Sequence, residues 1–381
     1  DSGLKGFRFK GSVYAAREGD VVFPNEPVLR VEASMLEAQL VETLLLNLLN
    51  FESLIATKAA RMRYVAGDRV LSDFGLRRAQ ALGGYHATRA SIVGGFNSTS
   101  NVKGAMDFGL AAAGTMAHSF IQGYDNELDA FRAFAEKRAD QCVLLVDTYD
   151  TLRSGVPNAI VVAKEMENKG QRLLSIRLDS GDLAYLARNA RKMLDEAGLH
   201  YVTITASNQL DEYVIESLLS QNAPIDVFGV GTNLVTGAPD AALDGVYKLA
   251  FADGKPRIKL SDNLKKITLP HRKQVYRLIR NDAEFAGGDV IALEAEKDLK
   301  AMHHLYEPDK SLDIESFTKE TLLHRVMENG KRTGAASSLQ EIAAFSRARL
   351  SMLPQEYKRF KNPHIYKVGL SDGLRDLRNE L

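Results

Sequence analysis

The stretch Leu173-Leu-Ser-Ile-Arg-Leu-Asp-Ser-Gly-Asp-Leu183 decides how the chain is organised. Its first five residues predict a short apolar strand, and Asp179 to Asp182 then predict a turn before a helix that begins at Leu183. In parallel α/β folds, ligands bind at the carboxyl ends of such strands. Two carboxylates and an arginine at this place suit a polyol phosphate or its metal ion. The alternative is that the polar residues only cap the helix.

Short apolar segments alternate with helical segments on both sides of this unit. The apolar segments are expected at residues 91–94, 109–113, 141–146, 172–178, 201–205 and 225–230. Alternation at this spacing predicts a parallel sheet whose strands are joined by crossover helices. Six or seven such units favour a barrel over an open sheet, since no dinucleotide-binding glycine pattern opens the first unit.

The two ends of the chain have a different texture. Residues 6–33 predict short antiparallel strands, and a strand pattern returns beyond Tyr247 before a helical end. Residues 35–63 predict a helix that is apolar nearly all round, which we expect to be buried against a domain or a subunit. The main apolar stripe of this helix consists of Leu36, Leu40, Leu44, Leu48 and Ile55.

The predicted fold class is therefore α/β. An irregular (β/α) barrel is expected at residues 67–250, and a smaller α+β domain is expected to form from residues 1–66 and 251–381, with the C-terminal segment packing back on the N-terminal strands.

Composition excludes several classes of protein. Lys+Arg and Asp+Glu both number 49, so no basic excess indicates nucleic acid or an anionic membrane as a partner. The single cysteine, Cys142, excludes an intramolecular disulfide and a cysteine-rich zinc site, and it fits a reducing cytoplasm. Residues 1–8 lack the apolar core of a signal peptide, and polar residues interrupt the longest apolar run, Val41 to Ala56. We expect a soluble, cytoplasmic protein.

Three polar residues follow successive predicted strands. His118 comes just after the strand near residue 113, Asp147 ends the next strand, and Asp179 ends the one after it. The carboxyl ends of parallel strands meet on one face, so this run predicts a site there. A histidine in such a site can act as acid, base, ligand or nucleophile, although a structural role was the alternative for His118 by its position alone.

Other strand-end loops suit anions. Gly229, Gly231 and Thr232 leave backbone N–H groups and a hydroxyl free for a phosphate, and Ser207-Asn-Gln follows the preceding strand. Ser98 or Thr99, after a Gly-Gly turn, can start an anion-binding helix or merely cap it. Arginine forks match phosphate and carboxylate, but adjacent Arg77 and Arg78 point differently on a helix, so we expect at most one of them to reach a given ligand.

With these loops in place, the chain closely resembles the nicotinate phosphoribosyltransferases, a type II phosphoribosyltransferase family. The match runs in order through nearly the whole chain. Its main stretches are Gly11-Ser-Val-Tyr14, Val21-Val-Phe-Pro24, Glu37-Ala-Gln-Leu-Val-Glu42, Ile55-Ala-Thr-Lys-Ala-Ala60, Phe74-Gly-Leu-Arg-Arg-Ala-Gln80, Thr99-Ser-Asn-Val102, Ala117-His-Ser119, Asp147-Thr-Tyr-Asp150, Arg177-Leu-Asp-Ser-Gly-Asp182, Gly229-Val-Gly-Thr232, Lys273-Gln274 and Asn362-Pro-His364.

The resemblance implies an activity. Nicotinate and phosphoribosyl pyrophosphate give nicotinate mononucleotide and pyrophosphate, coupled to ATP hydrolysis through transient phosphorylation of the histidine that matches His118. It also implies Mg²⁺ bound with phosphoribosyl pyrophosphate and ATP, a role in NAD biosynthesis, and a homodimer with shared active sites.

The resemblance also implies roles for residues at matching positions. Arg177 and Asp179 would hold the phosphoribosyl group, with Asp147 near the ribose and His118. Phe74 would stack on the pyridine ring, while Arg77 and Ser100 would lie near its carboxylate. The 5-phosphate would be bound by Ser207, Asn208, Gly229, Gly231 and Thr232.

Three alternatives stay open. A nicotinamide phosphoribosyltransferase is disfavoured by Ser100, because the related enzyme has an aspartate there that would repel nicotinate. A decarboxylating quinolinate enzyme is disfavoured by His118. An inactive barrel or fragment is the third alternative, because the family's N-terminal segment, with an aromatic residue that reaches the partner's site, does not precede the first strands here. A second departure is Pro270-His271, where the family commonly has Pro-Gly.

Overall fold

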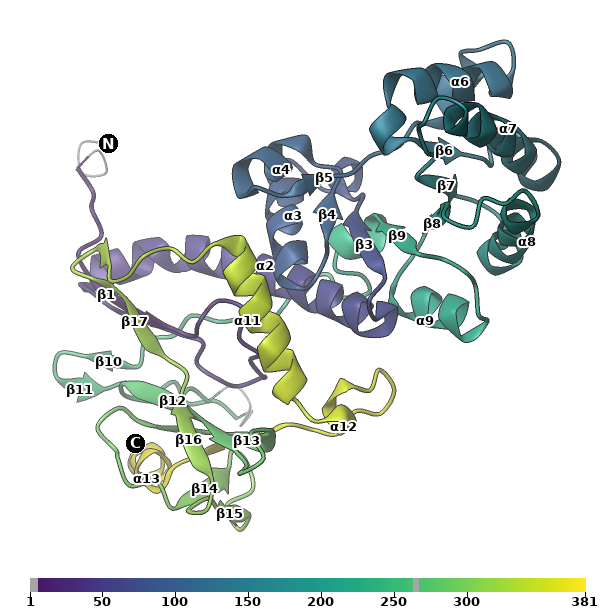
Figure 1. The fold of residues 1–381 in the computed structure, drawn as a ribbon. Helices are drawn as coiled ribbons and strands as arrows, with labels where there is room; N and C mark the ends of the chain where they lie inside the picture. The colour runs from purple at the N-terminus through teal and green to yellow at the C-terminus, as the bar shows by residue number, and fades with distance from the viewer. Residues whose placement is uncertain (1–5, 263–266) are drawn as a thin grey trace. The chain divides into compact units, whose positions relative to one another are not determined.

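The computed structural model describes residues 6–262 and 267–381 (Figure 1). Residues 1–8, from which we predict the absence of a signal peptide, lie partly outside these ranges. The chain forms two compact units, one made of Leu49–Leu243 and the other of the segment up to Leu48 together with Asp244–Leu381. The division falls within the long helix α2 (Met35–Ala66) and not after it, where the sequence had suggested a boundary.

The unit of residues 49–243 is built on a seven-stranded parallel sheet. Its strand order is β5-β4-β3-β9-β8-β7-β6. Each strand pairs with the strand before or after it in the chain, and β9 pairs with β3, as in a closed barrel. Within the described part of the chain β5 and β6 share no ladder, so the sheet is a curled half-barrel with an open edge between them. The predicted α/β class is confirmed. The strands are β3 (Val70–Asp73), β4 (Ser98–Thr99), β5 (Ala111–Ala112), β6 (Val143–Leu145), β7 (Ser175–Leu178), β8 (Thr203–Ser207) and β9 (Val227–Val230).

Helices follow the strands, as the alternation predicts. The helices and tight turns of this unit are η1 (Leu76–Arg78), α3 (Gly83–Val93), α4 (Val102–Phe108), α5 (His118–Gln122), α6 (Glu127–Lys137), η2 (Ala139–Gln141), η3 (Thr151–Gly155), α7 (Val156–Glu167), α8 (Leu183–Glu196), α9 (Glu212–Ser220) and α10 (Thr232–Val235).

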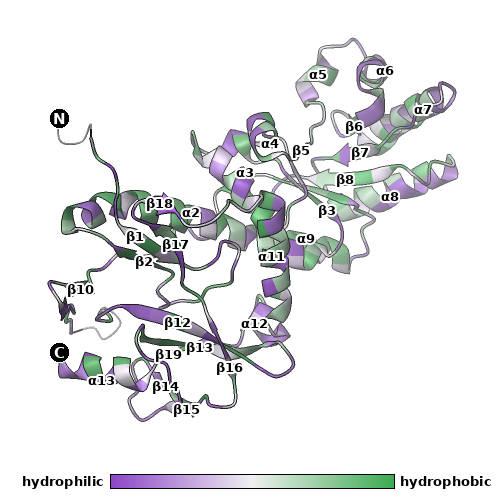
Figure 2. Cartoon of the chain, turned by 60° about the vertical axis from the view of Figure 1, so that its left-hand side comes forward, coloured by the Kyte–Doolittle hydropathy of each residue, from purple (hydrophilic) through white to green (hydrophobic). Residues whose placement is uncertain are grey.

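Helix α8 shows how the sequence forms one of these helices. Asp182 is its N-cap, and the Asp182 carboxylate accepts a hydrogen bond from the backbone N–H of Tyr185, which the first turn would otherwise leave unpaired. Leu183, Ala187 and Leu194 recur on one face and are buried, and Figure 2 shows hydrophobic and hydrophilic residues alternating along the helix. Burial of this stripe fixes the helix against the sheet.

The interior of the sheet is apolar. Leu144, Ile176, Ile204 and Phe228 each lie near the middle of a strand and are fully buried, because a parallel sheet of this class is covered on both faces. Cys142 lies beside them, and burial raises the pKa of its thiol to about 12, so the thiol stays protonated and unreactive at neutral pH.

Two sequence predictions for this unit were wrong. The segment Ser91–Gly94, expected as a strand, is the end of α3 and its cap, while the strand is β4, a few residues later. A short apolar run does not by itself distinguish strand from helix, and here the helical period of α3 continues through it. Strand β3, which lies inside the sheet between β4 and β9, was not predicted.

We expect the apolar stripe of α2 to be buried against a domain or a subunit, and the described chain covers only part of this stripe. Ile55 is buried, but Leu36, Leu40 and Leu44 are exposed. Burial against a second subunit stays a prediction. By length and composition alone, α2 is long and apolar enough to cross a membrane.

The other unit contains two larger sheets and a small hairpin, β10–β11. One sheet has the order β18-β17-β1-β2, so C-terminal strand β17 pairs with N-terminal β1 as the sequence indicates. The other has the order β15-β14-β19-β13-β12-β16. The bounds are β1 (Ser12–Ala15), β2 (Leu29–Glu32), β10 (Phe251–Ala252), β11 (Lys255–Pro256), β12 (Lys273–Ile279), β13 (Phe285–Leu293), β14 (Ala301–His304), β15 (Ser311–Asp313), β16 (Thr318–Thr321), β17 (His324–Glu328), β18 (Lys331–Arg332), β19 (Lys367–Leu370), α11 (Leu339–Met352), α12 (Gln355–Lys358) and α13 (Asp372–Glu380).

The turn at His271, where the family commonly has glycine, is kept in this chain. His271 has φ of 67°, the left-handed region that glycine adopts without strain. The Lys273 ammonium donates to the carbonyls of Leu269 and His271 at 2.8 and 2.6 Å, which holds the turn closed.

A buried arginine holds the second unit together. Arg277 is fully buried and donates to the Asp289 carboxylate at 2.9 Å and to Asp20 at 2.9 Å. The Tyr366 hydroxyl donates to Asp289 at 2.7 Å, and Arg349 donates to Asp20 at 2.8 Å. A loop near the N-terminus, strands β12 and β13, helix α11 and the segment before β19 therefore meet on one charge network.

Replacing Asp289 with alanine should destabilise this unit. Removal of one partner of a buried ion pair leaves an uncompensated charge and costs about 3–5 kcal/mol. The measurement is urea unfolding followed by circular dichroism. The control is Asp282→Ala in the β12–β13 turn, whose side chain is exposed and which should change the free energy of unfolding by less than about 1 kcal/mol. Equal effects of the two variants would contradict the prediction.

Candidate active site

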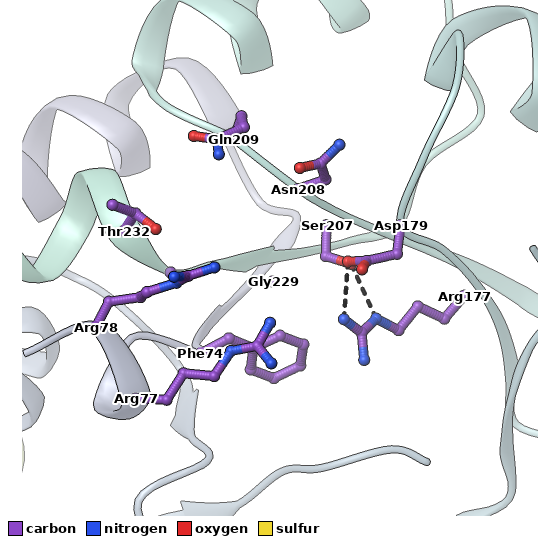
Figure 3. Close-up of a pocket in the computed structure, with 11 residues that line it drawn as sticks. Phe74, Arg77, Arg78, Arg177, Asp179, Ser207, Asn208, Gln209, Gly229 and Thr232 are labelled. Carbon is purple, nitrogen blue, oxygen red and sulfur yellow. Dashed lines mark hydrogen bonds and ion pairs between the residues drawn. The ribbon is translucent and has the colours of Figure 1, made fainter. Parts of the chain in front are cut away.

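A pocket lies at the carboxyl end of the parallel sheet, where the predicted loops converge (Figure 3). It is formed by the loops that follow β3, β7, β8 and β9. The lining residues are Phe74, Arg77, Arg78, Arg177, Asp179, Ser207, Asn208, Gln209, Gly229, Gly231 and Thr232.

Arg177 is the most heavily bonded side chain of this pocket. Its guanidinium donates to the Ser207 hydroxyl at 2.9 Å, to the Thr115 hydroxyl at 2.7 Å and to the Asp179 carboxylate at 2.8 Å. Thr115 follows β5, Asp179 follows β7 and Ser207 ends β8. One guanidinium thus joins three strand ends, and Figure 3 shows its bonds to Asp179 and Ser207 at the edge of the pocket.

Asp179 carries a negative charge at neutral pH. Burial raises the pKa of this carboxyl, but the hydrogen bond from Ser207 and the positive charge of Arg177 outweigh burial and lower the pKa from its ordinary value. The second carboxylate oxygen of Asp179 lies 3.8 Å from Nε2 of His118.

The loop after β6 completes this cluster. An Asp147 carboxylate oxygen, Oδ2, accepts from the backbone N–H of Asp179 at 2.8 Å and from the Ser180 hydroxyl at 2.6 Å. Its other oxygen, Oδ1, is buried with no hydrogen-bond partner among the residues described. His118 Nδ1 lies 3.1 Å from the Thr148 hydroxyl. The structure therefore brings His118, Asp147 and Asp179 together, as their places at successive strand ends predict.

Phe74 forms one wall of the pocket. Its ring packs on Gly229, where an added Cβ would lie 2.4 Å from a ring carbon. The Arg177 guanidinium carbon lies 5.4 Å from the ring centroid. The absence of a side chain at Gly229 therefore decides where the Phe74 ring can lie.

A buried carboxylate fixes the turn that carries Phe74. Asp73 accepts hydrogen bonds from the Gly75 backbone and from the hydroxyls of Thr88 and Thr99, all between 2.8 and 2.9 Å. Burial raises the pKa of Asp73 more than these bonds lower it. The Asp73 carbonyl also accepts from the Ser100 backbone N–H at 2.7 Å. Asp73 therefore orients both the turn after β3 and the residue that follows β4.

Ser100 itself is half-buried and does not line the pocket. The cap of the following helix is Asn101, whose side chain accepts from the Gly104 N–H, and not Ser98 or Thr99.

The loop after β8 is held in an unusual backbone conformation. Asn208 and Gln209 have φ of 87° and 49°, a region that non-glycine residues rarely adopt. Such strain persists where the surrounding structure imposes it, and it is common at ligand sites. Figure 3 shows both side chains across the pocket from Phe74 and Arg77.

Sequence reasoning missed two lining residues, Arg78 and Gln209. The expectation that at most one of Arg77 and Arg78 reaches a given ligand stays a prediction. The two residues end a tight 3₁₀ turn, η1, at the pocket edge, and both line the same pocket. With Arg177 they give the pocket three guanidinium groups against one carboxylate, Asp179, which suits a ligand with several negative charges.

Comparisons with known proteins agree with this geometry. The family described as "Nicotinate phosphoribosyltransferase (NAPRTase) family" matches residues 70–306, and the family's N-terminal and C-terminal domain descriptions match residues 2–50 and 272–378. A Bacillus subtilis nicotinate phosphoribosyltransferase is 47% identical over 94% of this chain and 75% of its own length. A Dictyostelium discoideum protein of the same name is 39% identical over 97% of this chain and 73% of its own length. The crystal structure of human nicotinic acid phosphoribosyltransferase is 30% identical, covers 98% of this chain and 83% of its own, and superposes with a TM-score of 0.82.

The half-barrel and its arginine-lined pocket are therefore those of a phosphoribosyltransferase. Within that class, the chain belongs to the nicotinate phosphoribosyltransferase family. The resemblance found in the sequence is confirmed.

Replacing Gly229 with alanine should disturb the pocket without unfolding the protein. The added methyl would meet the Phe74 ring at 2.4 Å and force it to move. Overpacking of this kind costs about 1–3 kcal/mol of stability, and ligand affinity should fall with it. Nicotinate binding by calorimetry and the melting temperature measure the two effects. The control is Gly114→Ala, because a Cβ there meets nothing within 4 Å. A Gly229→Ala variant with wild-type affinity would contradict this role.

Proposed function

We propose that the protein transfers the phosphoribosyl group of phosphoribosyl pyrophosphate to nicotinate, which gives nicotinate mononucleotide and pyrophosphate for NAD biosynthesis. Membership of the family supports this reaction. The observation that carries it is the bonded set of Arg177, Asp179 and Ser207 beside Phe74 in a pocket rich in arginine.

The phosphoribosyl group would lie along the loops after β7, β8 and β9. Arg177 and Asp179 would hold the ribose end through their charge and hydrogen-bonding capacity. Backbone N–H groups and hydroxyls in turns of this kind favour a phosphate. The 5-phosphate would be bound by Ser207, Asn208, Gly229, Gly231 and Thr232, all of which line the pocket with Arg78 and Gln209 beside them.

The pyridine ring of nicotinate would stack on Phe74. Arg77 extends into the same space (Figure 3) and can form a bidentate pair with the nicotinate carboxylate. Ser100, held next to Phe74 by the Asp73 carbonyl, would favour the acid because it adds no negative charge at this corner.

Glycosyl transfer develops positive charge on the ribose, and the ionised Asp179 and the neighbouring Asp147 can stabilise it. Mg²⁺ usually binds through one or two carboxylates and substrate phosphates. The unpartnered, buried Oδ1 of Asp147 fits such an ion. Mg²⁺ brought with phosphoribosyl pyrophosphate and ATP would offset the charge of the leaving pyrophosphate.

His118 would accept a phosphoryl group from ATP and so couple ATP hydrolysis to the reaction. Its side chain is 41% exposed, which leaves the ring accessible to a second substrate, while Thr148 and Asp179 border its two nitrogens. A nitrogen nucleophile placed between a hydroxyl and a carboxylate is suited to this role.

We further propose a cytoplasmic homodimer with shared active sites. The exposed leucines of α2, Leu36, Leu40 and Leu44, support an interface, because an apolar stripe of this kind is unfavourable in water. The buried single cysteine is in keeping with a reducing compartment.

The first test is pyrophosphate release from nicotinate and phosphoribosyl pyrophosphate with Mg²⁺, with and without ATP. ATP should stimulate the wild type, and His118→Ala should lose that stimulation while it keeps an ATP-independent rate. The control is His200→Ala, an exposed histidine that pairs with Asp195 away from the pocket, which should behave as wild type. A wild-type rate indifferent to ATP would show that His118 has no coupling role.

A second test concerns the choice of base. Ser100→Asp should raise the KM for nicotinate at least about tenfold, which corresponds to ~1.4 kcal/mol of added repulsion. Steady-state kinetics with nicotinate and with nicotinamide measure the change in preference. Ser100→Ala removes the hydroxyl without adding charge and should have the smaller effect. An unchanged KM in Ser100→Asp would place the nicotinate carboxylate elsewhere.

A further inference from the structure

The open edge of the half-barrel poses a structural problem for His118. Strands β5 and β6 share no ladder in the described residues, and the segment between them carries His118 at the start of α5 and Glu127 at the start of α6. Backbone hydrogen bonds of the sheet therefore do not fix this segment against the loop after β6. Side chains have to do so if His118 is to keep its place beside Asp147 and Asp179.

Glu127 makes such a connection from a buried position. Glu127 is only 4% exposed. Its Oε2 atom accepts hydrogen bonds from the Asn158 amide at 2.9 Å and from the Ser154 hydroxyl. The other oxygen, Oε1, is buried with no hydrogen-bond partner among the described residues. Burial of a carboxylate that has no cationic partner is costly, so packing alone does not account for this residue.

The partner segment is an unusual turn. Ser154 belongs to η3 (Thr151–Gly155), a single π-helical turn capped by Asp150, whose carboxylate accepts from the Leu152 and Arg153 N–H groups at 3.1 and 2.8 Å. Turns of this type occur often at functional sites. The turn packs directly on the end of β6, because a Cβ on Gly155 would lie 1.8 Å from the Val146 carbonyl oxygen.

Asp147 and Thr148 lie between that strand end and the π turn, so a shift of the turn moves both of them. Two sets of buried or half-buried contacts then join the two segments in the described chain. His118 contacts Thr148 at one end, and Glu127 contacts Ser154 and Asn158 at the other.

We propose that Glu127 is a positioning residue that sets the separation of His118 from the Asp147–Thr148 loop across the open edge of the half-barrel. The role rests on the proposed phosphorylation of His118 by ATP. Among the described residues, Glu127 hydrogen-bonds to Ser154 and Asn158 and to none that line the pocket, whereas Arg177 and Ser207 lie in β7 and β8 and Asn208 follows β8. Loss of Glu127 therefore impairs the ATP-dependent step more than the ATP-independent turnover.

The test compares Glu127→Ala with wild type in pyrophosphate release with and without ATP, and in acid-labile labelling of the protein by ATP labelled in its γ-phosphate. ATP stimulation and labelling should fall at least about tenfold, since a misplacement of about 1 Å can cost about 100-fold. The rate without ATP should fall much less, because the contacts of Arg177, Asp179 and Ser207 remain although Asp147 shifts with its loop.

Two further variants control for loss of packing. Glu165→Ala also removes a contact between α6 and α7, the ion pair of Arg132 with Glu165, but that pair is exposed, and ATP stimulation should be unchanged. Ser154→Ala leaves Asn158 to bind Glu127 and should lose part of the stimulation. If Glu127→Ala unfolds below the assay temperature, Ser154→Ala is the variant that tests the positioning role.

The outcomes are distinguishable. If ATP stimulates wild type and both Glu127→Ala and Ser154→Ala equally, the positioning role is wrong and the proposed coupling stands. An equal loss of the rates with and without ATP would show a general structural role and would also overturn the inference. If wild type is indifferent to ATP, the coupling itself fails, and the role of Glu127 with it.

Discussion

The hydrogen bonds of the Arg177 guanidinium are the constraint on which the catalytic unit depends. Three of its donors meet Thr115, Asp179 and Ser207, which lie on the strand ends after β5, β7 and β8. Because the sheet is open between β5 and β6, the bond to Thr115 ties the β5 edge of the sheet to β7, the neighbour of the opposite edge strand β6. The same charge keeps Asp179 ionised. One residue thus shapes the pocket, closes the curl of the sheet and sets the charge of a neighbouring carboxylate.

A second arginine, Arg277, also bonds to several partners, but it does not line the pocket. Arg277 in the other unit is fully buried, and Asp289 and Asp20 pair with it. Every strong interaction there is made within the protein, so the network stabilises the fold. Arg177 has similar partners but its side chain keeps 15% of its surface exposed, and it borders a pocket with two more arginines. Access to a ligand, and not the type of interaction, separates the two.

The open edge of the sheet links the fold to the chemistry. A closed barrel would hold the loops after β5 and β6 by backbone hydrogen bonds. Here side-chain contacts replace that ladder, at His118 with Thr148 and at Glu127 with Ser154. Side-chain contacts can break and re-form without unfolding the strands. An edge of this kind would suit the phosphorylation of His118 by ATP that we propose.

The sequence by itself determined the α/β class, most of the strand–helix pairs, and the place of His118, Asp147, Asp179 and Gly229 at strand ends, because these follow from local periodicity and from the rule that parallel strands end on one face. It misassigned Ser91–Gly94, since a short apolar run fits either a strand or a helix. Only the tertiary structure decided that Arg78 and Gln209 line the pocket, that Leu36, Leu40 and Leu44 stay exposed, and that Glu127 reaches Ser154. These facts depend on contacts between residues far apart in the chain, and local sequence patterns carry no record of such distances.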